Sequence, residues 1–316
     1  MDATISVEGI RAAADVVDPV FLHSPQFDCE PLSERLGVAT VLKVESVNPI
    51  RSFKGRGTDY LLHKLGGRET HVVCASAGNF GQGMAYACRK RGVPITVFAA
   101  RGASPLKIDR MRALGATVGL EGDDFDEAKD AARAYATRHG FLFVEDGLIG
   151  AIGEGAGTIG LELAEGREEL DAIFVPLGNG SLVNGVGTWI KHASSQTRII
   201  AVCAEGAPSM ALSWKARKAL DAPTDSIADG IAVRVPVPAA VEITLTTVDD
   251  VMLVSDDAMR MWIRRLFTDA GLVVEPSGAA GLAAIAEHAN DLEGKRVATI
   301  LTGGNLTEQQ IKDWLY

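Results

Sequence analysis

Lys54 is the residue of this chain with the clearest potential for covalent chemistry. It follows an apolar run at Thr40–Glu45 that is typical of a buried strand, and Ser52 can cap a helix that begins beside it. The helix dipole disfavours a lysine in the first turn, because the positive end of the dipole lies there. Such a lysine gives up its proton more readily and can attack an aldehyde to form a Schiff base. An exposed surface lysine is the alternative that this pattern leaves open.

A second candidate loop, Ser76 to Gly83, consists mostly of small residues and follows the apolar run His71–Ala75. Small residues let a backbone approach a ligand closely, and the N–H groups that open the next helix can bind a carboxylate. A tight turn in which Asn79 merely caps that helix is the alternative.

Two further loops also follow strand-like runs. Thr302 comes directly after Val297–Leu301 and could offer its hydroxyl to a ligand nitrogen or act only as a cap. The run Ala172–Pro176 leads into a glycine-rich turn whose main-chain N–H groups and serine hydroxyl suit a phosphate. That turn comprises Gly178, Asn179, Gly180, Ser181 and Leu182.

A fifth glycine-rich segment, 153–160, superficially suggests a dinucleotide-binding fold. The segment before it, 145–152, is a poor strand, and no acidic residue closes the next strand at the usual offset. The sequence therefore argues against a Rossmann dehydrogenase.

Short runs rich in valine and isoleucine alternate with helical patterns along the chain. Strands that alternate with helices predict parallel sheets and an α/β fold. The four loops above then lie at the carboxyl ends of strands, where doubly wound proteins bind their ligands. The expected strands are Thr40–Glu45, His71–Ala75, Ile95–Ala99, Phe141–Val144, Ala172–Pro176, Ile199–Ala204 and Val297–Leu301.

Three helices have well-marked ends. One begins with Ser104 as its cap and Pro105 at its first position, and should stop near Gly115. The others, Ala85–Arg91 and Ala128–His139, should end at the glycines that follow them. The proline-containing stretch Asp221–Val241 is expected to be irregular surface structure.

Composition limits the class of protein. The 316 residues are 47% hydrophobic and 23% charged, which is ordinary for a globular chain of two domains or lobes. The net charge of −10 argues against a nucleic-acid partner. Four widely spaced cysteines indicate neither a zinc site nor disulfides, so a reducing cytoplasm is the expected location. No signal peptide and no apolar run of membrane-spanning length is found, so no membrane partner is expected.

Taken in order, the four loops resemble the threonine dehydratase and serine racemase family of pyridoxal-phosphate enzymes. The sequences IADG at 227–230 and EPSG at 275–278 belong to the same pattern, and the resemblance extends from Val41 to Asn305. It implies the tryptophan-synthase-β-like fold, with two lobes built on open parallel sheets. A small mobile lobe, 72–146, would be inserted into a large cofactor-binding lobe formed by 1–71 and 147–316. A homodimer is implied as well.

The resemblance also assigns the cofactor site. Lys54 would hold pyridoxal 5'-phosphate as a Schiff base, and the cofactor ring would lie against Phe53. Asn79 would hydrogen-bond the 3′-oxygen, and Thr302 would face the pyridine nitrogen. The turn from Gly178 to Leu182 would cradle the phosphate.

The implied reaction is α,β-elimination from a β-hydroxy L-amino acid such as threonine or serine, which yields a 2-oxo acid and ammonia. The backbone around Ser76, Gly78, Asn79 and Phe80 would bind the substrate α-carboxylate, and the freed Lys54 would remove the Cα proton. A neutral hydroxyl at the pyridine nitrogen favours prompt loss of the β-substituent. The family's racemases carry a serine where this chain has Ala77, so racemisation is disfavoured.

Three departures from the family pattern carry expectations of their own. No second carboxylate follows Glu205 closely, so no metal is expected, and the end of the chain at Tyr316 leaves no room for a regulatory domain. Phe80 stands in place of a common histidine, and Arg51 replaces a small residue. Arg51 could point into the site and recognise a second acidic group, as on 3-hydroxyaspartate, or it could be a solvated arginine.

Three alternatives to threonine or serine dehydration remain at this point. The first is a hydroxyaspartate-type ammonia-lyase. The second is β-replacement, as in cysteine synthase or threonine synthase, although those enzymes usually carry a threonine-rich asparagine loop. The third is a pyridoxal-phosphate-binding homologue without turnover.

Overall fold

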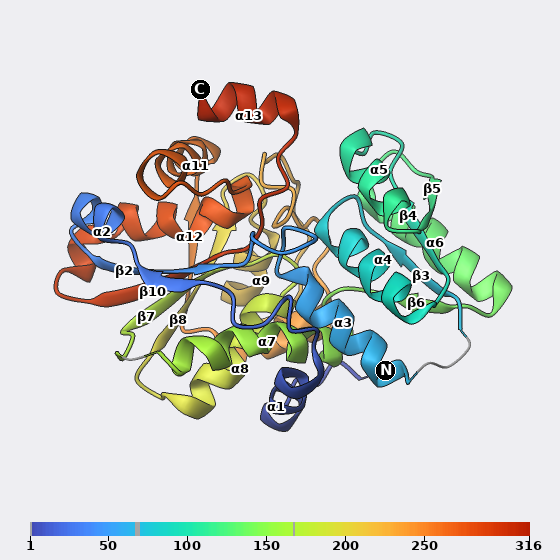
Figure 1. Cartoon of the computed structure of the whole chain (residues 1–316), viewed down its shortest axis with the longest axis horizontal. Coiled ribbons are helices and arrows are strands. Elements are labelled where there is room, and N and C mark those ends of the chain that lie inside the picture. Colours follow the sequence, from blue (N-terminus) through green and yellow to red (C-terminus); the bar gives the residue numbers. More distant parts are fainter. Residues whose placement is uncertain (1, 67–69, 167) are drawn as a thin grey trace.

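The computed structural model describes residues 2–66, 70–166 and 168–316, which form two sheets flanked by helices (Figure 1). The larger sheet has the strand order β1-β2-β10-β7-β8-β9. β1 pairs antiparallel with β2, and every other pair in this sheet is parallel. The strands are β1 (Gln26–Asp28), β2 (Ala39–Val44), β7 (Ala172–Pro176), β8 (Arg198–Ala204), β9 (Asp250–Val254) and β10 (Arg296–Leu301).

The smaller sheet has the order β5-β4-β3-β6, and all of its pairs are parallel. Alternate residues of β3 face opposite sides: Val72 and Cys74 pack into one apolar core, Val73 and Ala75 into another. Helices therefore cover both faces of this sheet, as a parallel sheet requires. Its strands are β3 (Val72–Ala75), β4 (Ile95–Ala99), β5 (Thr117–Leu120) and β6 (Leu142–Val144).

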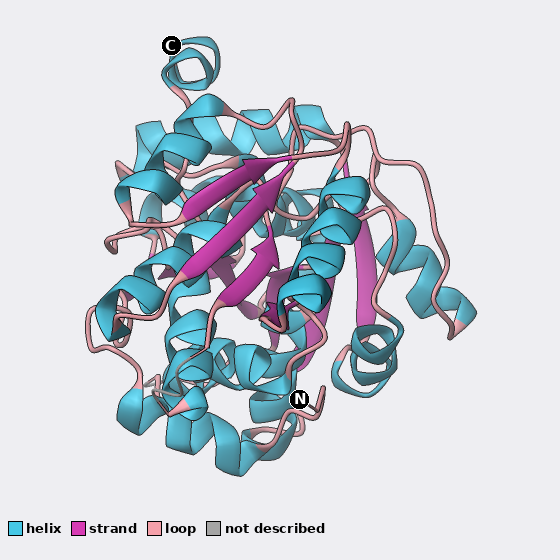
Figure 2. Ribbon diagram, turned by 90° about the vertical axis from the view of Figure 1, so that its right-hand side faces the viewer, coloured by secondary structure: helices cyan, strands magenta, loops and turns pink. Residues whose placement is uncertain are grey.

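Helices surround both sheets, and the strands lie in the interior (Figure 2). In Figure 1 the large sheet has α12 on one side and α7 and α8 on the other. The helices are α1 (Val7–Val16), α2 (Glu30–Leu36), α3 (Lys54–Leu65), α4 (Asn79–Arg91), α5 (Pro105–Ala113), α6 (Phe125–His139), α7 (Gly150–Ala164), α8 (Ser181–Ala193), α9 (Ser209–Ala216), α10 (Pro238–Thr247), α11 (Asp256–Ala270), α12 (Pro276–Glu287), the short 3₁₀ helix η1 (Ala289–Leu292) and α13 (Glu308–Leu315).

Helix α3 lies between the two sheets (Figure 1). Its buried residues Leu61 and Leu62 share an apolar core with Met84 and Cys88 of α4. This core therefore crosses residue 71, whereas the core on the other face of the small sheet, which contains Val73, Ala75 and Phe98, lies wholly within 72–146. The expected division into a lobe at 72–146 and a lobe at 1–71 and 147–316 stays a prediction.

A buried ion network fixes α3 to its neighbours. Arg56 is fully buried and lies 2.8 Å from Glu45, just after β2, and 2.5 Å from Glu162 on α7. Lys43 lies 2.5 Å from Glu162. Burial alone would raise the pKa of Glu162, but the hydrogen bonds and charges of Arg56 and Lys43 outweigh it and lower that pKa. The network therefore ties β2, α3 and α7 together at Arg56, which follows Lys54 by two residues in α3.

The glycine-rich segment 153–160 lies inside α7, where it serves helix packing. A Cβ added to Gly155 would lie 2.6 Å from the carbonyl oxygen of Arg56, and one on Gly157 would lie 2.6 Å from Ile10. The glycines let α7 approach α3 and α1 closely. The prediction that this segment is not a dinucleotide-binding loop is confirmed.

The α/β fold and all seven predicted strands are confirmed. The three strands that the sequence missed, β1, β5 and β9, lie at sheet edges. Edge strands are short and half exposed, so they leave only a weak apolar run in the sequence. The predicted helix ends at Gly92, Gly115 and Gly140 are confirmed, since each of these glycines has a positive φ just beyond a helix.

Three local predictions need correction. Residues 238–241 of the stretch expected to be irregular are helical, because Pro238 begins α10 as its first residue. Ser104 occupies the cap position of α5, but its side chain makes no capping hydrogen bond. At α3, Phe53 rather than Ser52 holds the cap position, although the Ser52 hydroxyl does accept from the Lys54 N–H at 3.3 Å.

Candidate active site

A cavity of about 330 Å³ lies between the two sheets, and all four loops line it. Its volume is in the range of small-molecule sites. The structure brings together Phe53, Lys54, residues 76–80, residues 178–182 and Thr302, that is, every residue predicted for the site except Arg51.

Backbone contacts bring the loops together. Ser52 forms an isolated bridge with Gly303, and the Phe53 N–H donates to the carbonyl of Thr302 at 3.1 Å. In the small sheet, Cys74 of β3 pairs with Val144 of β6, so residues 75–76 and 145–146 leave the sheet side by side. The cavity therefore lies at the carboxyl ends of the strands in both sheets, as predicted.

Lys54, the first residue of α3, presents its amine to the cavity. Its Nζ lies 4.7 Å from the centre of the Phe53 ring and 5.9 Å from that of Phe80. The same Nζ lies 2.6 Å from Oδ2 of Asp146. An amine held between two rings and one carboxylate, and only 15% exposed, is placed to react with an aldehyde that enters the cavity.

The glycine-rich turn is an anion site by geometry. Gly180 has a φ of +92° and directly precedes α8, so the first N–H groups of that helix face the cavity. A Cβ on Gly178 would lie 2.8 Å from the carbonyl oxygen of Gly230, which explains why this position needs a glycine. The Ser181 hydroxyl accepts from the Gly147 N–H at 3.1 Å and donates to Asp146 at 2.6 Å.

Two hydroxyls on the cavity wall are buried without a partner among the described residues: Thr302 Oγ1 and Ser277 Oγ. Leaving such a group unsatisfied costs about 1–3 kcal/mol, so a ligand that supplies a polar atom there is favoured. An aldehyde that carries a phosphate and a ring nitrogen would pair with Lys54, with the turn at 178–182 and with one of these hydroxyls. The residues present thus fit pyridoxal phosphate.

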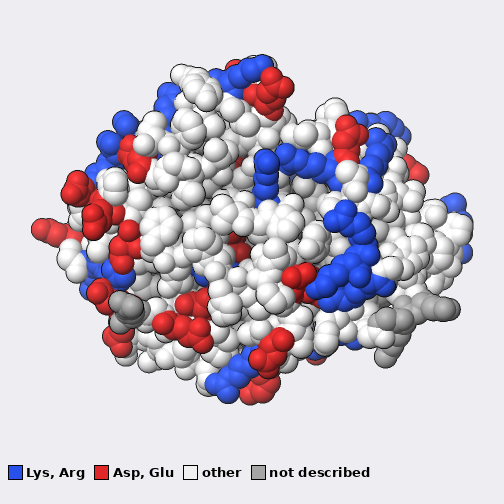
Figure 3. Space-filling view, viewed as in Figure 1, with Lys and Arg blue, Asp and Glu red and all other residues white. Residues whose placement is uncertain are grey.

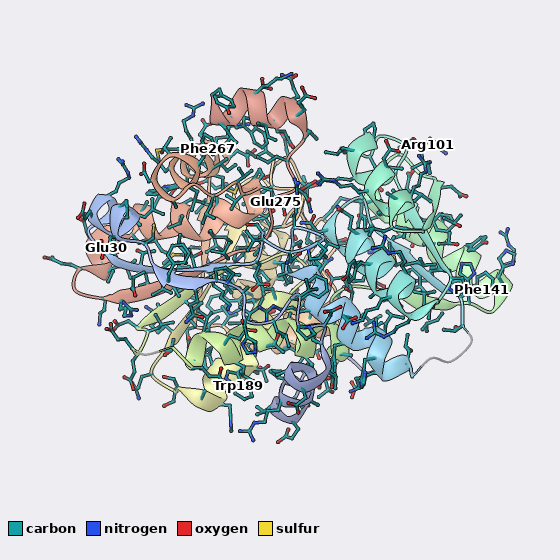
Figure 4. The ribbon with its side chains drawn as sticks, viewed as in Figure 1. Glu30, Arg101, Phe141, Trp189, Phe267 and Glu275 are labelled. Atoms are coloured by element: carbon teal, nitrogen blue, oxygen red, sulfur yellow. The ribbon has the colours of Figure 1, made fainter. Side chains whose placement is uncertain are left out.

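Asn79 is held by other side chains. Its amide nitrogen donates to Glu275 at 2.5 Å, and its amide oxygen accepts from Asn305 at 2.7 Å. Glu275 lies at the start of α12, near the middle of the molecule (Figure 4). Burial raises the pKa of Glu275 to about 7, and the charge of Asp229 adds to this rise. The expected contact of Asn79 with the cofactor stays a prediction.

The loop expected to bind a carboxylate is shaped by Ser76. The Ser76 hydroxyl accepts from the N–H groups of Gly78 at 3.1 Å and Gly81 at 2.9 Å. Helix α4 begins at Asn79, so its first N–H groups lie at the cavity wall. Ser76, Gly78, Asn79 and Phe80 are all part of that wall.

Arg51 is the exception among the predicted site residues. It is exposed, has a φ of +52°, and does not line the cavity. Its carbonyl accepts from the Gly304 N–H at 3.0 Å. The Arg51 side chain is therefore exposed to solvent and does not reach the site, contrary to what the hypothesis of a second acidic group required.

The sequence missed several polar residues of the cavity wall, among them Lys107, Asp146, Asp229 and Glu275. Asp229 and Glu275 lie within the IADG and EPSG sequences. These sequences contributed to the family resemblance but did not indicate that the two side chains line the cavity. Lys107 pairs across the cavity with Asp229. Asp146 left one usable signal, an acidic residue just beyond a predicted strand.

The fold and the cavity define an α/β enzyme with a site for a phosphorylated aldehyde cofactor. Comparison with known families makes this specific: the chain belongs to the family described as "PALP: Pyridoxal-phosphate dependent enzyme", which matches residues 18–303. The expected family and cofactor are thereby confirmed.

Individual relatives cover most of the chain. The L-threonine ammonia-lyase of Thermotoga maritima is 36% identical over 312 residues, which span 97% of this chain and 77% of the relative. Among solved structures, maize serine racemase has a TM-score of 0.92 at 26% identity and covers 98% of this chain and 96% of its own. The processed threonine deaminase isoform 2 of Solanum lycopersicum has a TM-score of 0.90 at 28% identity, and the match covers 99% of this chain and 89% of the deaminase chain.

No three His, Cys, Asp or Glu side chains of the described ranges gather into a possible metal site. None of the described helices has the length and apolar character needed to cross a bilayer.

On the face shown in Figure 3, acidic and basic side chains are interspersed, and a notch indents the surface between the α13 side and the α5 side.

Proposed function

We propose that this protein is a lyase that eliminates water from a β-hydroxy L-amino acid, threonine or serine, and releases a 2-oxo acid and ammonia. The observation that carries the proposal is the position of Lys54 Nζ in the cavity, while Ala77 in the facing loop offers no second acid or base. The names of the relatives support the same activity, since several are threonine dehydratases or ammonia-lyases.

Each wall of the cavity has its own part in the reaction. Lys54 would hold the cofactor, Phe53 would lie against its ring, and residues 178–182 would bind its phosphate through main-chain N–H groups and the Ser181 hydroxyl. Thr302 would face the ring nitrogen. When bound, pyridoxal phosphate acidifies the Cα–H bond of the amino acid joined to it.

The remaining steps belong to the protein. The loop 76–80 binds and orients the substrate α-carboxylate through the N–H groups at the start of α4. The amine of Lys54, when neutral and not engaged by the cofactor, would accept the Cα proton of the substrate. A neutral Thr302 hydroxyl would bring no negative charge to the ring nitrogen to hold a proton there, and this would favour rapid loss of the β-substituent.

The test is 2-oxo acid release by the purified holoenzyme from L-threonine, L-serine and L-threo-3-hydroxyaspartate. We expect turnover of threonine or serine, and its loss in Lys54→Ala together with the absorbance of the covalently held cofactor. Lys64→Ala, at the other end of α3, is the matched control and should keep both. A wild-type enzyme inactive on all three substrates would contradict the assignment.

Elimination from an acidic amino acid such as 3-hydroxyaspartate is the second candidate. Arg51 no longer supports it, but Lys107 does, because its side chain is 8% exposed and lies in the cavity wall. A substrate with a second carboxylate could replace Asp229 as its partner.

We further propose a homodimer in the cytoplasm, in which residues 72–146 move as a lobe to close the cavity. The four cysteines are buried free thiols, which suits a reducing compartment. Light scattering of the purified protein tests the dimer, and scattering with and without substrate tests the closure.

A further inference from the structure

We propose that Asp146 is a second acid–base residue of this site, which accepts the proton that Lys54 removes from the substrate and delivers it to the leaving β-hydroxyl. The inference deepens the proposed function and rests on it, since it concerns the elimination of a hydroxyl group.

The contact between the two side chains is direct and sheltered. Lys54 Nζ lies 2.6 Å from Oδ2 of Asp146, and the Ser181 hydroxyl donates to Oδ1 at 2.6 Å. The side chain of Asp146 is 8% exposed and that of Lys54 is 15% exposed. A proton on Nζ can therefore pass to Oδ2 along an existing hydrogen bond, with little competition from water.

The position of Asp146 also brings it to the substrate. It follows β6, whose Val144 pairs with Cys74 of β3, so it leaves the sheet beside the loop proposed for the α-carboxylate. Oδ1 is held by Ser181, which leaves Oδ2 as the oxygen shared between Lys54 and the cavity.

Asp146 is the acidic side chain of the cavity wall that contacts Lys54. The others have partners elsewhere: Asp126 and Glu145 pair with Lys129, Asp229 pairs with Lys107, and Glu275 accepts from Asn79. Among the described residues of the cavity wall, Asp146 is therefore the carboxylate in position for the relay.

The step balances without any other reagent. The Cα–H bond breaks and its proton goes to neutral Lys54 Nζ, which passes a proton to the Asp146 carboxylate. Asp146 then protonates the β-oxygen as the Cβ–O bond breaks, the Cα–H electron pair becomes the new carbon–carbon double bond, and water leaves. Lys54 ends neutral and Asp146 ends ionised, as both began. A hydroxyl needs such a proton because hydroxide is a poor leaving group.

The test compares two leaving groups on the holoenzyme. Chloride leaves β-chloro-L-alanine without a proton, whereas L-serine must receive one. We expect Asp146→Asn to lower kcat on L-serine by about 100-fold or more, the scale of a lost general acid, and to leave kcat on β-chloroalanine near the wild-type value. Equal losses on both substrates would mean that Asp146 only shapes the site and would overturn the relay.

Glu145→Gln is the matched control. It removes the same charge from the neighbouring residue of the same wall, but Glu145 pairs with Lys129 and Arg133 and not with Lys54. Both substrates should keep their wild-type rates in this variant. A wild-type enzyme that is inactive on L-serine and L-threonine would instead overturn the proposed function itself.

A second readout needs no turnover. In the cofactor-free protein, acetic anhydride acylates lysine amines only in their neutral form. Because Asp146→Asn removes a charged hydrogen-bond partner of Nζ, it should speed acylation of Lys54 at pH 7 by about tenfold or more, as read by peptide mass spectrometry. Glu145→Gln should match the wild type. An unchanged rate in Asp146→Asn would show that the carboxylate does not hold the Lys54 proton and would overturn the proposal.

Discussion

The Phe53 N–H donates to the carbonyl oxygen of Thr302 at 3.1 Å. This hydrogen bond joins the turn that carries Lys54 to the end of β10, although the two residues lie far apart in the sequence. The backbone segments that carry the amine proposed to hold the cofactor aldehyde and the hydroxyl proposed to face its ring nitrogen are therefore held together by this bond. Such backbone anchoring is one condition for a preorganised site.

Thr302 should contribute to cofactor affinity and not to the stability of the cofactor-free protein. Its Oγ1 has no partner among the described residues, so Thr302→Ala removes nothing that the apoprotein uses. We expect the dissociation constant for pyridoxal phosphate to rise about five- to tenfold, the worth of one hydrogen bond, as measured by fluorescence titration.

Thr299→Ala on the same strand is the control for this prediction. The Thr299 hydroxyl donates to the carbonyl of Phe174 at 3.2 Å, so its loss should lower the apoprotein's free energy of unfolding without altering cofactor affinity. Reversed effects in the two variants would show that Thr302 does not face the cofactor.

Arg51 and Lys107 should differ in their effect on acidic substrates. Arg51 points away from the cavity, so Arg51→Ala should change kcat/KM for L-serine and for threo-3-hydroxyaspartate by the same factor. Lys107→Met removes the amine from the cavity wall and should lower kcat/KM for the acidic substrate about tenfold or more relative to L-serine, the worth of a charged hydrogen bond. A selective effect of Arg51→Ala would restore the original hypothesis.

The buried network around Arg56 should be essential to folding stability. Arg56→Met leaves Glu45 and Glu162 buried without their main partner, and the loss of one member of a buried ion pair costs about 3–5 kcal/mol. Arg101→Met breaks an exposed ion pair, in which the side chain of Arg101 is 63% exposed and that of its partner Asp123 is 86% exposed. This variant should lose less than about 1 kcal/mol of stability. Urea unfolding of the two variants measures both; similar values would contradict the buried character of the network.

Glu275 should make stability depend on pH. Its pKa of about 7 in the folded protein lies above the ordinary 4.5, so the folded state holds a proton that the unfolded state has released between these values. The stabilisation is complete below pH 4.5 and is lost as the pH rises through 7, in total about 3 kcal/mol.

Glu275→Gln removes this titration. The free energy of unfolding of the variant relative to the wild type should therefore rise by about 3 kcal/mol from pH 4.5 to pH 8 in chemical denaturation. The exposed Glu121→Gln should show no such relative change. A flat difference for Glu275→Gln would mean that this carboxylate is ionised across the whole range.

The sequence by itself determined the strands of the sheet interiors and the loops that follow them. Interior parallel strands are buried on both faces, so β2, β3, β4, β7, β8 and β10 appear as continuous apolar runs that need no tertiary information. The loops that follow these runs drew attention to four residues. Thr302 comes directly after a strand, and Lys54, Asn79 and Ser181 each open the helix that follows one. The edge strands β1, β5 and β9 were missed because half-exposed segments leave little pattern, whereas the edge strand β6 was predicted.

Only the tertiary structure decided which polar side chains meet. Arg51 was one residue from a predicted helix cap, yet a backbone φ of +52° sends it to solvent, and no residue spacing encodes that rotation. Asp146 and Lys54 lie 92 residues apart and come within 2.6 Å because β6 ends, and α3 begins, at the same cavity. Local sequence patterns fix where an element begins and ends, since those depend on neighbouring residues. The contacts between loops depend on how the two sheets and α3 pack, and that packing involves residues from the whole chain.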